Sequence, residues 1–338
     1  MANAHDGFAA HAPSARGGFP SAPGAARAGR RRARGVLARA ALGAAAVLLL
    51  CGACAMRPAA EPAPGPQPAS ADALAQAMAR EPVVLLGEVH DNAAQHALRA
   101  QALAMLLARG PRPAIAFEQI DRDQQDLVDR IRTDRSLDVA TRADRIVAEA
   151  GAKGWNWPLY RPYVVLALEN DLPIVGANLS RKQAMRVATE GMAAIFDARQ
   201  RATLGLEHIA PDIEKSQEYE IEQGHCGQLP AETLPAMAGA QIARDAVLAQ
   251  SITAYFSRGV VLLTGNGHAR RDIGVIRHIA ASERGHVISI GLLEDDDKAS
   301  GRAGFFDVAF LTPVQAREDP CILMHRGPML GRPGVGTD

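Results

Sequence analysis

The distribution of apolar residues along the chain predicts buried strands that alternate with helices. Short apolar runs, rich in valine and isoleucine, mostly follow a proline or a glycine, as is typical of strands buried on both faces. The runs lie at 83–86, 114–117, 173–177, 260–264 and 287–290, and 306–310 alternates like an edge strand. Because helical runs separate them, we expect an α/β fold in which a mainly parallel sheet carries helices on both faces.

The helical runs are longer and more polar than the strand runs. They are predicted at 70–80, 92–108, 121–132, 133–150, 163–170, 180–189, 198–206, 212–223, 234–256 and 273–281. Ser70 and Ser180 stand where N-cap residues are expected. Since no strand pattern interrupts 190–256 and most of 120–170, we expect a helical lobe over the C-terminal strand ends.

Polar side chains follow the strand runs at the point where each ends. Glu88 and His90 come just after the first run, Glu118 follows the second, and His268 follows the run at 260–264. The carboxyl ends of parallel strands share one edge, where open α/β sheets bind ligands. We therefore expect a common cleft, and it also takes in three further strand-end residues: Asn178, Asn266 and Arg270.

Charge argues against nucleic acid as a partner. The chain of 338 residues is neutral overall, but residues 1–53 hold seven arginines and one aspartate, so the remainder carries a net charge of −6. A mildly acidic protein without a basic stripe is not typical of a nucleic-acid-binding protein.

The N-terminal region indicates an exported protein. Residues 1–35 are rich in Ala, Gly, Arg and Pro, and we expect disorder there. Residues 36–53 combine an arginine with a short apolar run, the pattern of a secretory signal. Residues 54–69 form a proline-rich tether, residues 70–326 the α/β domain, and residues 327–338 a loose tail.

The cysteines suggest a lipid anchor and a disulfide bond. Gly52 and Ala53 precede Cys54, as in a bacterial lipobox, so Cys54 is the expected lipidation site; Cys51 fits less well, and a plain secretory signal is the alternative. We expect an exported lipoprotein that lies in the periplasm. In that oxidising compartment Cys226 and Cys321 would bridge, the alternative being two free thiols.

Two chemical interpretations of the cleft are open on the residues alone. Glu88, His90, Glu118 and His268 suit a divalent metal such as zinc, or an acid/base set for hydrolysis. Alternatively, the polar ring positions a large ligand. Common signatures are missing: there is no GxGxxG after the first strand, no phosphate-binding P-loop, no GxSxG elbow, no HExxH and no CxxCH.

Six motifs in order resemble the ChaN family of haem-binding lipoproteins, itself similar to the Tiki, TraB and erythromycin esterase superfamily. The resemblance covers roughly residues 70 to 325. It is carried by Gly87-Glu88-Val89-His90-Asp91-Asn92, Phe117-Glu118-Gln119, Trp157 through Tyr163, Ala177-Asn178-Leu179, His225 through Pro230, and Gly265-Asn266-Gly267-His268-Ala269-Arg270.

The resemblance implies a haem-binding protein for iron acquisition, a homodimer that holds haem between its subunits through a tyrosinate, and an outer-membrane haem receptor as a partner. Tyrosinate is a recognised ligand of ferric haem. Tyr160, Tyr163 and Tyr219 are the candidates, with Tyr163 favoured because it lies in a matched motif; a packed aromatic is the alternative. His225 would support a propionate or the iron. The alternative functions are a divalent-metal-dependent hydrolase of esters or peptides, and an interaction module with a vestigial cleft.

Overall fold

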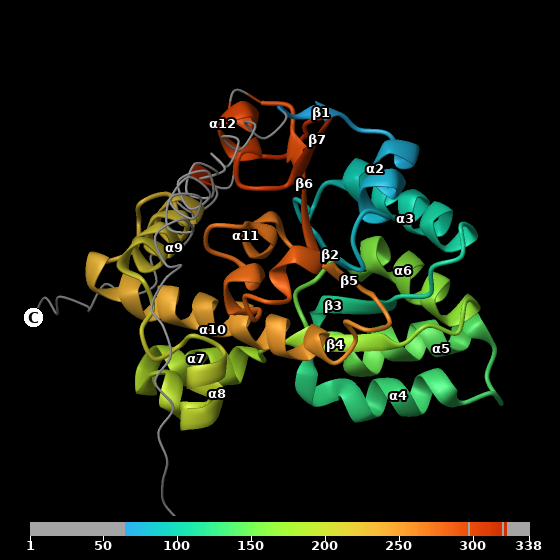
Figure 1. Cartoon of the computed structure of the whole chain (residues 1–338), viewed down its shortest axis with the longest axis horizontal. Helices are drawn as coiled ribbons and strands as arrows, with labels where there is room; N and C mark the ends of the chain where they lie inside the picture. Colours follow the sequence, from blue (N-terminus) through green and yellow to red (C-terminus); the bar gives the residue numbers. More distant parts are fainter. Residues whose placement is uncertain (1–64, 297, 320, 323–338) are drawn as a thin grey trace, which may run out of the picture. The chain divides into compact units, whose positions relative to one another are not determined.

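A seven-stranded sheet in which every pair is parallel organises the computed structural model (Figure 1). Its spatial order is β1-β7-β6-β2-β5-β3-β4. The strands are β1 Gln67–Pro68, β2 Val83–Leu86, β3 Ala114–Asp121, β4 Ile174–Asn178, β5 Val260–Leu263, β6 Val287–Glu294 and β7 Val308–Thr312. The predicted fold class, α/β with a parallel sheet, is confirmed.

The structure describes residues 65–296, 298–319, 321 and 322. The predicted signal segment, Cys54 and the tail 327–338 lie outside these residues. Among the described helices, none has the length and apolarity needed to cross a bilayer.

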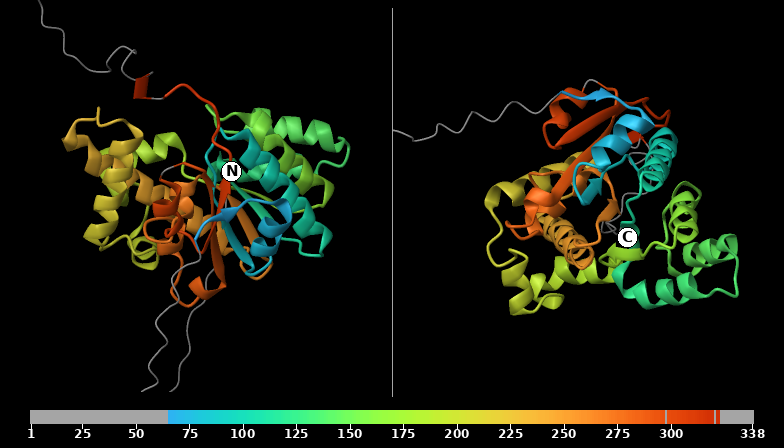
Figure 2. Two further views of the ribbon diagram at one scale, coloured as in Figure 1. Left: turned by 90° about the horizontal axis from the view of Figure 1, so that it is seen from above. Right: turned by 45° about the vertical axis from the view of Figure 1, so that its right-hand side comes forward.

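Helices cover both faces of the sheet because alternate side chains of each strand are buried in opposite directions (Figure 2). In β2, Val84 and Leu86 pack into one core and Val83 and Leu85 into the other. The first core takes side chains from α2 Ala71–Met78, α3 Ala93–Ala108, α4 Gln125–Thr133, α5 Val139–Arg145 and α6 Trp157–Glu169. The second takes its helical contribution mainly from α10 Leu234–Thr253.

The predicted helical lobe has its own apolar cluster. It contains α7 Arg181–Glu190, α8 Ala198–Thr203, α9 Pro211–Gly224 and the first part of α10. Two short helices, α11 Asn266–Ala269 and α12 Ala299–Ala303, follow β5 and β6. Ser70 and Ser180 cap α2 and α7 by accepting bonds from the backbone N–H groups of Ala73 and Gln183, as expected.

Several details differ from the sequence-based expectation. The strands β3 and β6 each run four residues further than expected, so Glu118 lies within β3 and not after it. The prediction of a helix at 273–281 is wrong, because only a 3-10 turn, Val275–His278, forms there. Gly274 lies so close to the preceding turn that a Cβ on it would stand 2.2 Å from the carbonyl oxygen of His268, which leaves no room for a regular helix start. The last strand begins two residues later than expected. It is not the edge strand, because β1, inside the range expected to be a tether, pairs with it.

The strand order brings the predicted cleft together. β2, β5 and β3 are neighbours, so their carboxyl ends lie side by side. Gly87 allows the loops after β2 and β5 to approach, since a Cβ there would stand 2.4 Å from Oδ1 of Asn266. A larger residue at this position would have to displace the side chain of Asn266.

Candidate functional site

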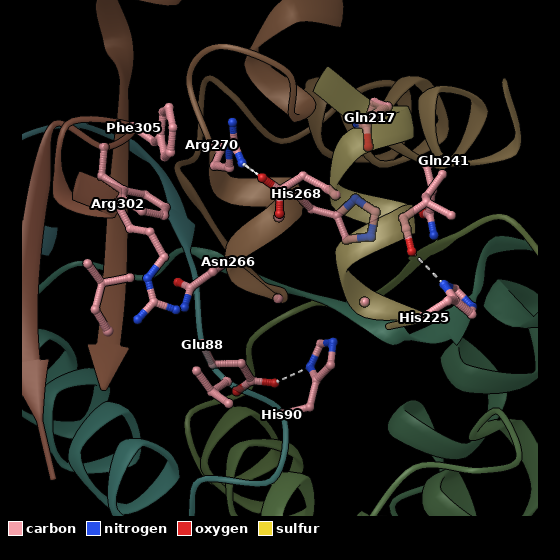
Figure 3. A pocket seen from close by; sticks show the side chains of 18 residues that line it. Glu88, His90, Gln217, His225, Gln241, Asn266, His268, Arg270, Arg302 and Phe305 are labelled. Atoms are coloured by element: carbon pink, nitrogen blue, oxygen red, sulfur yellow. Dashed lines mark hydrogen bonds and ion pairs between the residues drawn. The ribbon is translucent and has the colours of Figure 1, made fainter. Parts of the chain in front are cut away.

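A pocket of about 630 Å³ opens at the carboxyl ends of β2 and β5 (Figure 3). Its floor comes from the loops after these strands, which supply Glu88, His90 and His268. The helices α9 and α10 form one wall. The opposite wall comes from the end of β6 and the segment around α12, with Leu293 and Phe305.

The carboxylate of Glu88 is buried among four partners, one of which is His96, whose Nε2 lies 3.4 Å from Oε2. Its side chain is fully buried and pairs with the guanidinium of Arg99, which also donates to the carbonyl oxygen of Leu86 at 3.0 Å. The hydroxyl of Tyr160 donates to Glu88 Oε1 at 2.5 Å, and Nδ1 of His90 lies 3.1 Å from the same oxygen. These contacts are charge-assisted hydrogen bonds and ion pairs, which are stronger than bonds between neutral groups.

His90 is the most accessible ionisable group at the floor of the pocket. Its side chain is 47% exposed, and its ring meets Trp155 edge-on at 4.7 Å. Because Nδ1 faces the Glu88 carboxylate, we assign the ring proton to Nδ1. Burial of part of the ring lowers the pKa of His90, although the charge of Glu118 opposes the shift.

Glu118 and His268 form a second, deeper pair. Oε2 of Glu118 accepts from the hydroxyl of Thr264 at 2.7 Å and from the N–H of Gly265 at 2.8 Å, and Oε1 lies 3.5 Å from Nε2 of His268. Burial alone would raise the pKa of Glu118, but the imidazolium of His268 outweighs it and holds that pKa well below its usual range.

Asp245, on α10, completes this pair and was missed from the sequence. It is fully buried, and its Oδ1 lies 2.7 Å from Nδ1 of His268. Burial opposes the positive charge on His268, but the carboxylates of Asp245 and Glu118 prevail and raise its pKa to about 10. Gln217 of α9 donates to Oδ2 of Asp245 at 3.2 Å. His268 is therefore an imidazolium clamped between two acids.

None of the three expected tyrosines lines the pocket. Tyr160 and Tyr163 are fully buried in α6, and burial raises the pKa of both hydroxyls. Tyr163 donates to the carbonyl oxygen of His96 at 2.8 Å. Tyr219, on α9, is 58% exposed and does not line the pocket. In contrast, His225 lines it and donates from Nδ1 to the carbonyl oxygen of Ile221 at 2.7 Å.

The remaining strand-end residues support the pocket. Asn178 lies beneath it and donates to the carbonyl oxygen of Glu118 at 2.8 Å. Asn266 donates to the carbonyl oxygen of Leu292 at 2.7 Å and so ties the β5 loop to β6. Arg270 stacks on Phe305 with its guanidinium carbon 3.7 Å from the ring centre, and its nitrogens are engaged by Glu220 and Asp272.

A family model described as haem-binding uptake, Tiki superfamily, ChaN matches residues 74–279. The chain belongs to this family. The matched residues include the floor of the pocket, but the wall around α12 lies beyond them.

One solved structure supports the fold, and two others are more distantly similar. The structure of cofacial heme binding to ChaN of Campylobacter jejuni is 18% identical, with a TM-score of 0.58 over 70% of this chain and 90% of that one. The type III effector HopBA1 is 11% identical with a TM-score of 0.41 over 76% and 100%. An erythromycin esterase EreC mutant is 12% identical with a TM-score of 0.36 over 66% and 72%. The comparison with curated proteins gives no match.

The divalent-metal interpretation gains no support from this ChaN-family site. Within the described residues, no group of three or more His, Cys, Asp or Glu side chains could hold a metal ion. The physical reason lies in the partners: Glu88 is occupied by Arg99 and Tyr160, and Glu118 by Thr264 and the N–H of Gly265.

A disulfide joins Cys226 and Cys321, the pair that the sequence analysis expects to bridge. Cys226 directly follows His225 in the pocket wall. The C-terminal segment is also fastened by Arg317, which donates to Asp91 at 2.8 Å and to Glu294 at 2.6 Å. The wall at the end of α9 is thereby connected to the segment after β7.

Proposed function

We propose that this ChaN-family protein binds haem in the pocket at the strand ends and serves haem uptake. The observation that carries the proposal is the pocket itself. A volume of about 630 Å³ lies within the range of roughly 300–1,000 Å³ that is typical of sites for ligands of this size. Leu293, Phe305 and Ile221 supply an apolar lining, as a porphyrin requires.

The polar groups of the pocket also fit haem. His90 and His225 present imidazoles, which are common ligands of haem iron. Arg302 lines the same pocket and makes one bond, from Nη2 to Asp296 at 2.5 Å, while its Nε has no partner among the described residues. Arg302 can therefore take a propionate, because guanidinium groups pair well with carboxylates.

Of the three expected tyrosines, Tyr219 is the best candidate for the tyrosinate ligand of haem. Tyr160 and Tyr163 are buried and hydrogen-bonded, and their raised pKa values disfavour a tyrosinate. Tyr219 is exposed but does not line the pocket of its own chain. We propose that haem is held between two copies, with Tyr219 of one copy serving the haem bound in the other.

Cellular placement belongs to the same proposal. We propose that residues 36–53 direct export, that Cys54 carries the lipid anchor at the periplasmic face of the outer membrane, and that a haem receptor in that membrane is the partner. The disulfide between Cys226 and Cys321 supports an oxidising compartment. In a bacterial host, Cys54→Ala is expected to move the protein from the membrane fraction to the soluble fraction; unchanged fractionation would contradict the anchor.

The dimer and its ligand are tested by titrating the purified full chain with hemin while following absorption and sedimentation. We expect a saturable Soret shift and a haem-dependent increase in mass to that of two chains. Tyr219→Phe should abolish the mass increase and alter the spectrum. Tyr255→Phe is the matched control, because Tyr255 lies before β5 at the opposite edge of the sheet. If Tyr219→Phe and Tyr255→Phe both behave as wild type, Tyr219 is excluded as the tyrosinate ligand.

A second candidate function is metal-free hydrolysis, favoured by the two histidines. Opposite pKa shifts, lowered for His90 and raised to about 10 for His268, are the pattern of a general base beside a general acid. A panel of ester and peptide substrates tests it in metal-free buffer. Turnover that His268→Asn removes would support hydrolysis, and no turnover of any substrate would argue against it.

A further inference from the structure

We propose that His90 would hold the haem iron through Nε2. The proposal rests on the haem function proposed for the pocket. In addition to Tyr219 of a second copy, the iron would have a ligand from the copy whose pocket holds the haem. Figure 3 shows the His90 ring in the pocket, joined to Glu88 on its inner side.

The first argument is the tautomer. Nδ1 of His90 lies 3.1 Å from Oε1 of Glu88, whose carboxylate also pairs with the buried guanidinium of Arg99. A proton on Nδ1 leaves the lone pair of Nε2 free. Histidines that bind metals generally donate their other ring N–H to a carboxylate or a carbonyl in this way, which fixes the ring and makes it a stronger ligand.

The second argument is accessibility. The His90 side chain is 47% exposed and lines the pocket, and its Nε2 has no hydrogen-bond partner among the described residues. Trp155 packs edge-on against the ring at 4.7 Å, so the orientation is held although the ring is reachable. A ligand atom that is both oriented and open to the pocket needs little rearrangement to bind iron.

The third argument is the glycine beside the ring. Gly265 has a φ of −69°, which any residue can adopt, so its backbone does not require glycine. A Cβ at this position would stand 2.7 Å from Cε1 and 2.9 Å from Nε2 of His90. Glycine therefore keeps space next to the nitrogen that we assign to iron.

The other histidines near the floor are less suitable. His268 has Nδ1 at Asp245 and Nε2 near Glu118, so neither nitrogen is free. His96 is buried, and its Nε2 lies 3.0 Å from the carbonyl oxygen of His90. His225 lines the pocket, but its Nδ1 partner is a neutral carbonyl, that of Ile221.

The test compares ferric haem spectra of full-chain variants by absorption and electron paramagnetic resonance. His90→Gly should change the Soret and visible bands, shift the iron spin state and raise the hemin Kd about tenfold or more. Added imidazole should restore the wild-type spectrum by filling the vacated position. His286→Gly, before β6 at the opposite edge, is the matched control and should leave the spectrum unchanged.

A second variant leaves His90 in place. Gly265→Ala should displace the ring and reproduce part of the spectral change, whereas Gly285→Ala, whose new Cβ would meet nothing within 4 Å, should have no effect. Thermal unfolding shows whether each variant is folded.

The outcomes separate this inference from the function on which it rests. If folded His90→Gly binds hemin with the wild-type spectrum, His90 is not a ligand, although the haem function stands. If the wild-type chain shows no saturable hemin binding, the proposed function fails and the ligand assignment fails with it.

Discussion

At the residue scale, the site depends on charges buried in pairs. Glu88 and Arg99 are both fully buried, and each would be costly without the other. Their pairing leaves a fixed carboxylate that orients His90. His268 is likewise paired with two buried carboxylates, those of Asp245 and Glu118.

Removal of Arg99 is expected to destabilise the fold strongly. Arg99→Met leaves the carboxylate of Glu88 uncompensated, so the free energy of unfolding should fall by about 3–5 kcal/mol in urea denaturation. Arg109→Ala breaks an exposed pair with Asp72 just after the same helix and should cost no more than about 1 kcal/mol. Equal effects of the two substitutions would contradict a buried pair.

The raised pKa of His268 predicts that the free energy of unfolding depends on pH. Its pKa is about 10 in the folded chain, above the unfolded value of about 6.5, so folding takes up a proton on His268. The resulting stability is fully present below pH 6.5 and is lost as the pH rises toward 10. The destabilisation by His268→Gln should accordingly shrink between pH 6.5 and pH 10 in urea denaturation series. A constant difference across that range would show that His268 is not charged.

The strand-end residues were predictable because of where they stand. An acid or a histidine directly after a buried apolar run must lie at the sheet edge, which located Glu88, Glu118 and His268. Arg99 and Asp245 were missed because they sit inside helices. A signal for Asp245 exists: it lies three residues after Ile242 and four before Ala249, on the apolar side of its helix. The partner of such an acid depends on tertiary packing and cannot be read from helical spacing.

At the scale of elements, buried strands were located more reliably than short helices. A run such as Val260–Leu263 must be buried wherever the sheet lies, so composition alone identifies it. The segment 273–281 is also apolar, yet it forms a 3-10 turn because Gly274 is pressed against the backbone of His268. Such a constraint arises from contacts that the local sequence does not contain.

The disulfide joins two elements that the chain separates by 95 residues. The variant with both Cys226→Ser and Cys321→Ser is expected to lose about 2–4 kcal/mol of unfolding free energy relative to the oxidised wild type. Denaturation in the presence of dithiothreitol is the internal control, since wild type and variant should then coincide. A difference that persists under reduction would mean that the serines, not the bond, cause the loss.

At the scale of the whole molecule, the pocket is assembled from distant parts of the chain. The ChaN-family match covers its floor and the α9 wall, whereas Arg302 and Phe305 come from the segment beyond residue 279. The volume and lining of the pocket could not be predicted from sequence, because they depend on how α9, α10 and α12 are placed around the strand ends.

The most direct test of the central claim is a hemin titration of a full-chain variant in which a large side chain occupies the pocket. Gln241→Trp places a large side chain in the pocket from α10, where the buried side-chain oxygen of Gln241 has no partner among the residues that the structure describes. Gln76→Trp, on exposed surface of α2, is the control. We predict a saturable Soret shift for wild type and Gln76→Trp, and at least tenfold weaker binding for Gln241→Trp. Wild-type affinity in Gln241→Trp, or no saturable binding in wild type, would contradict haem binding at this site.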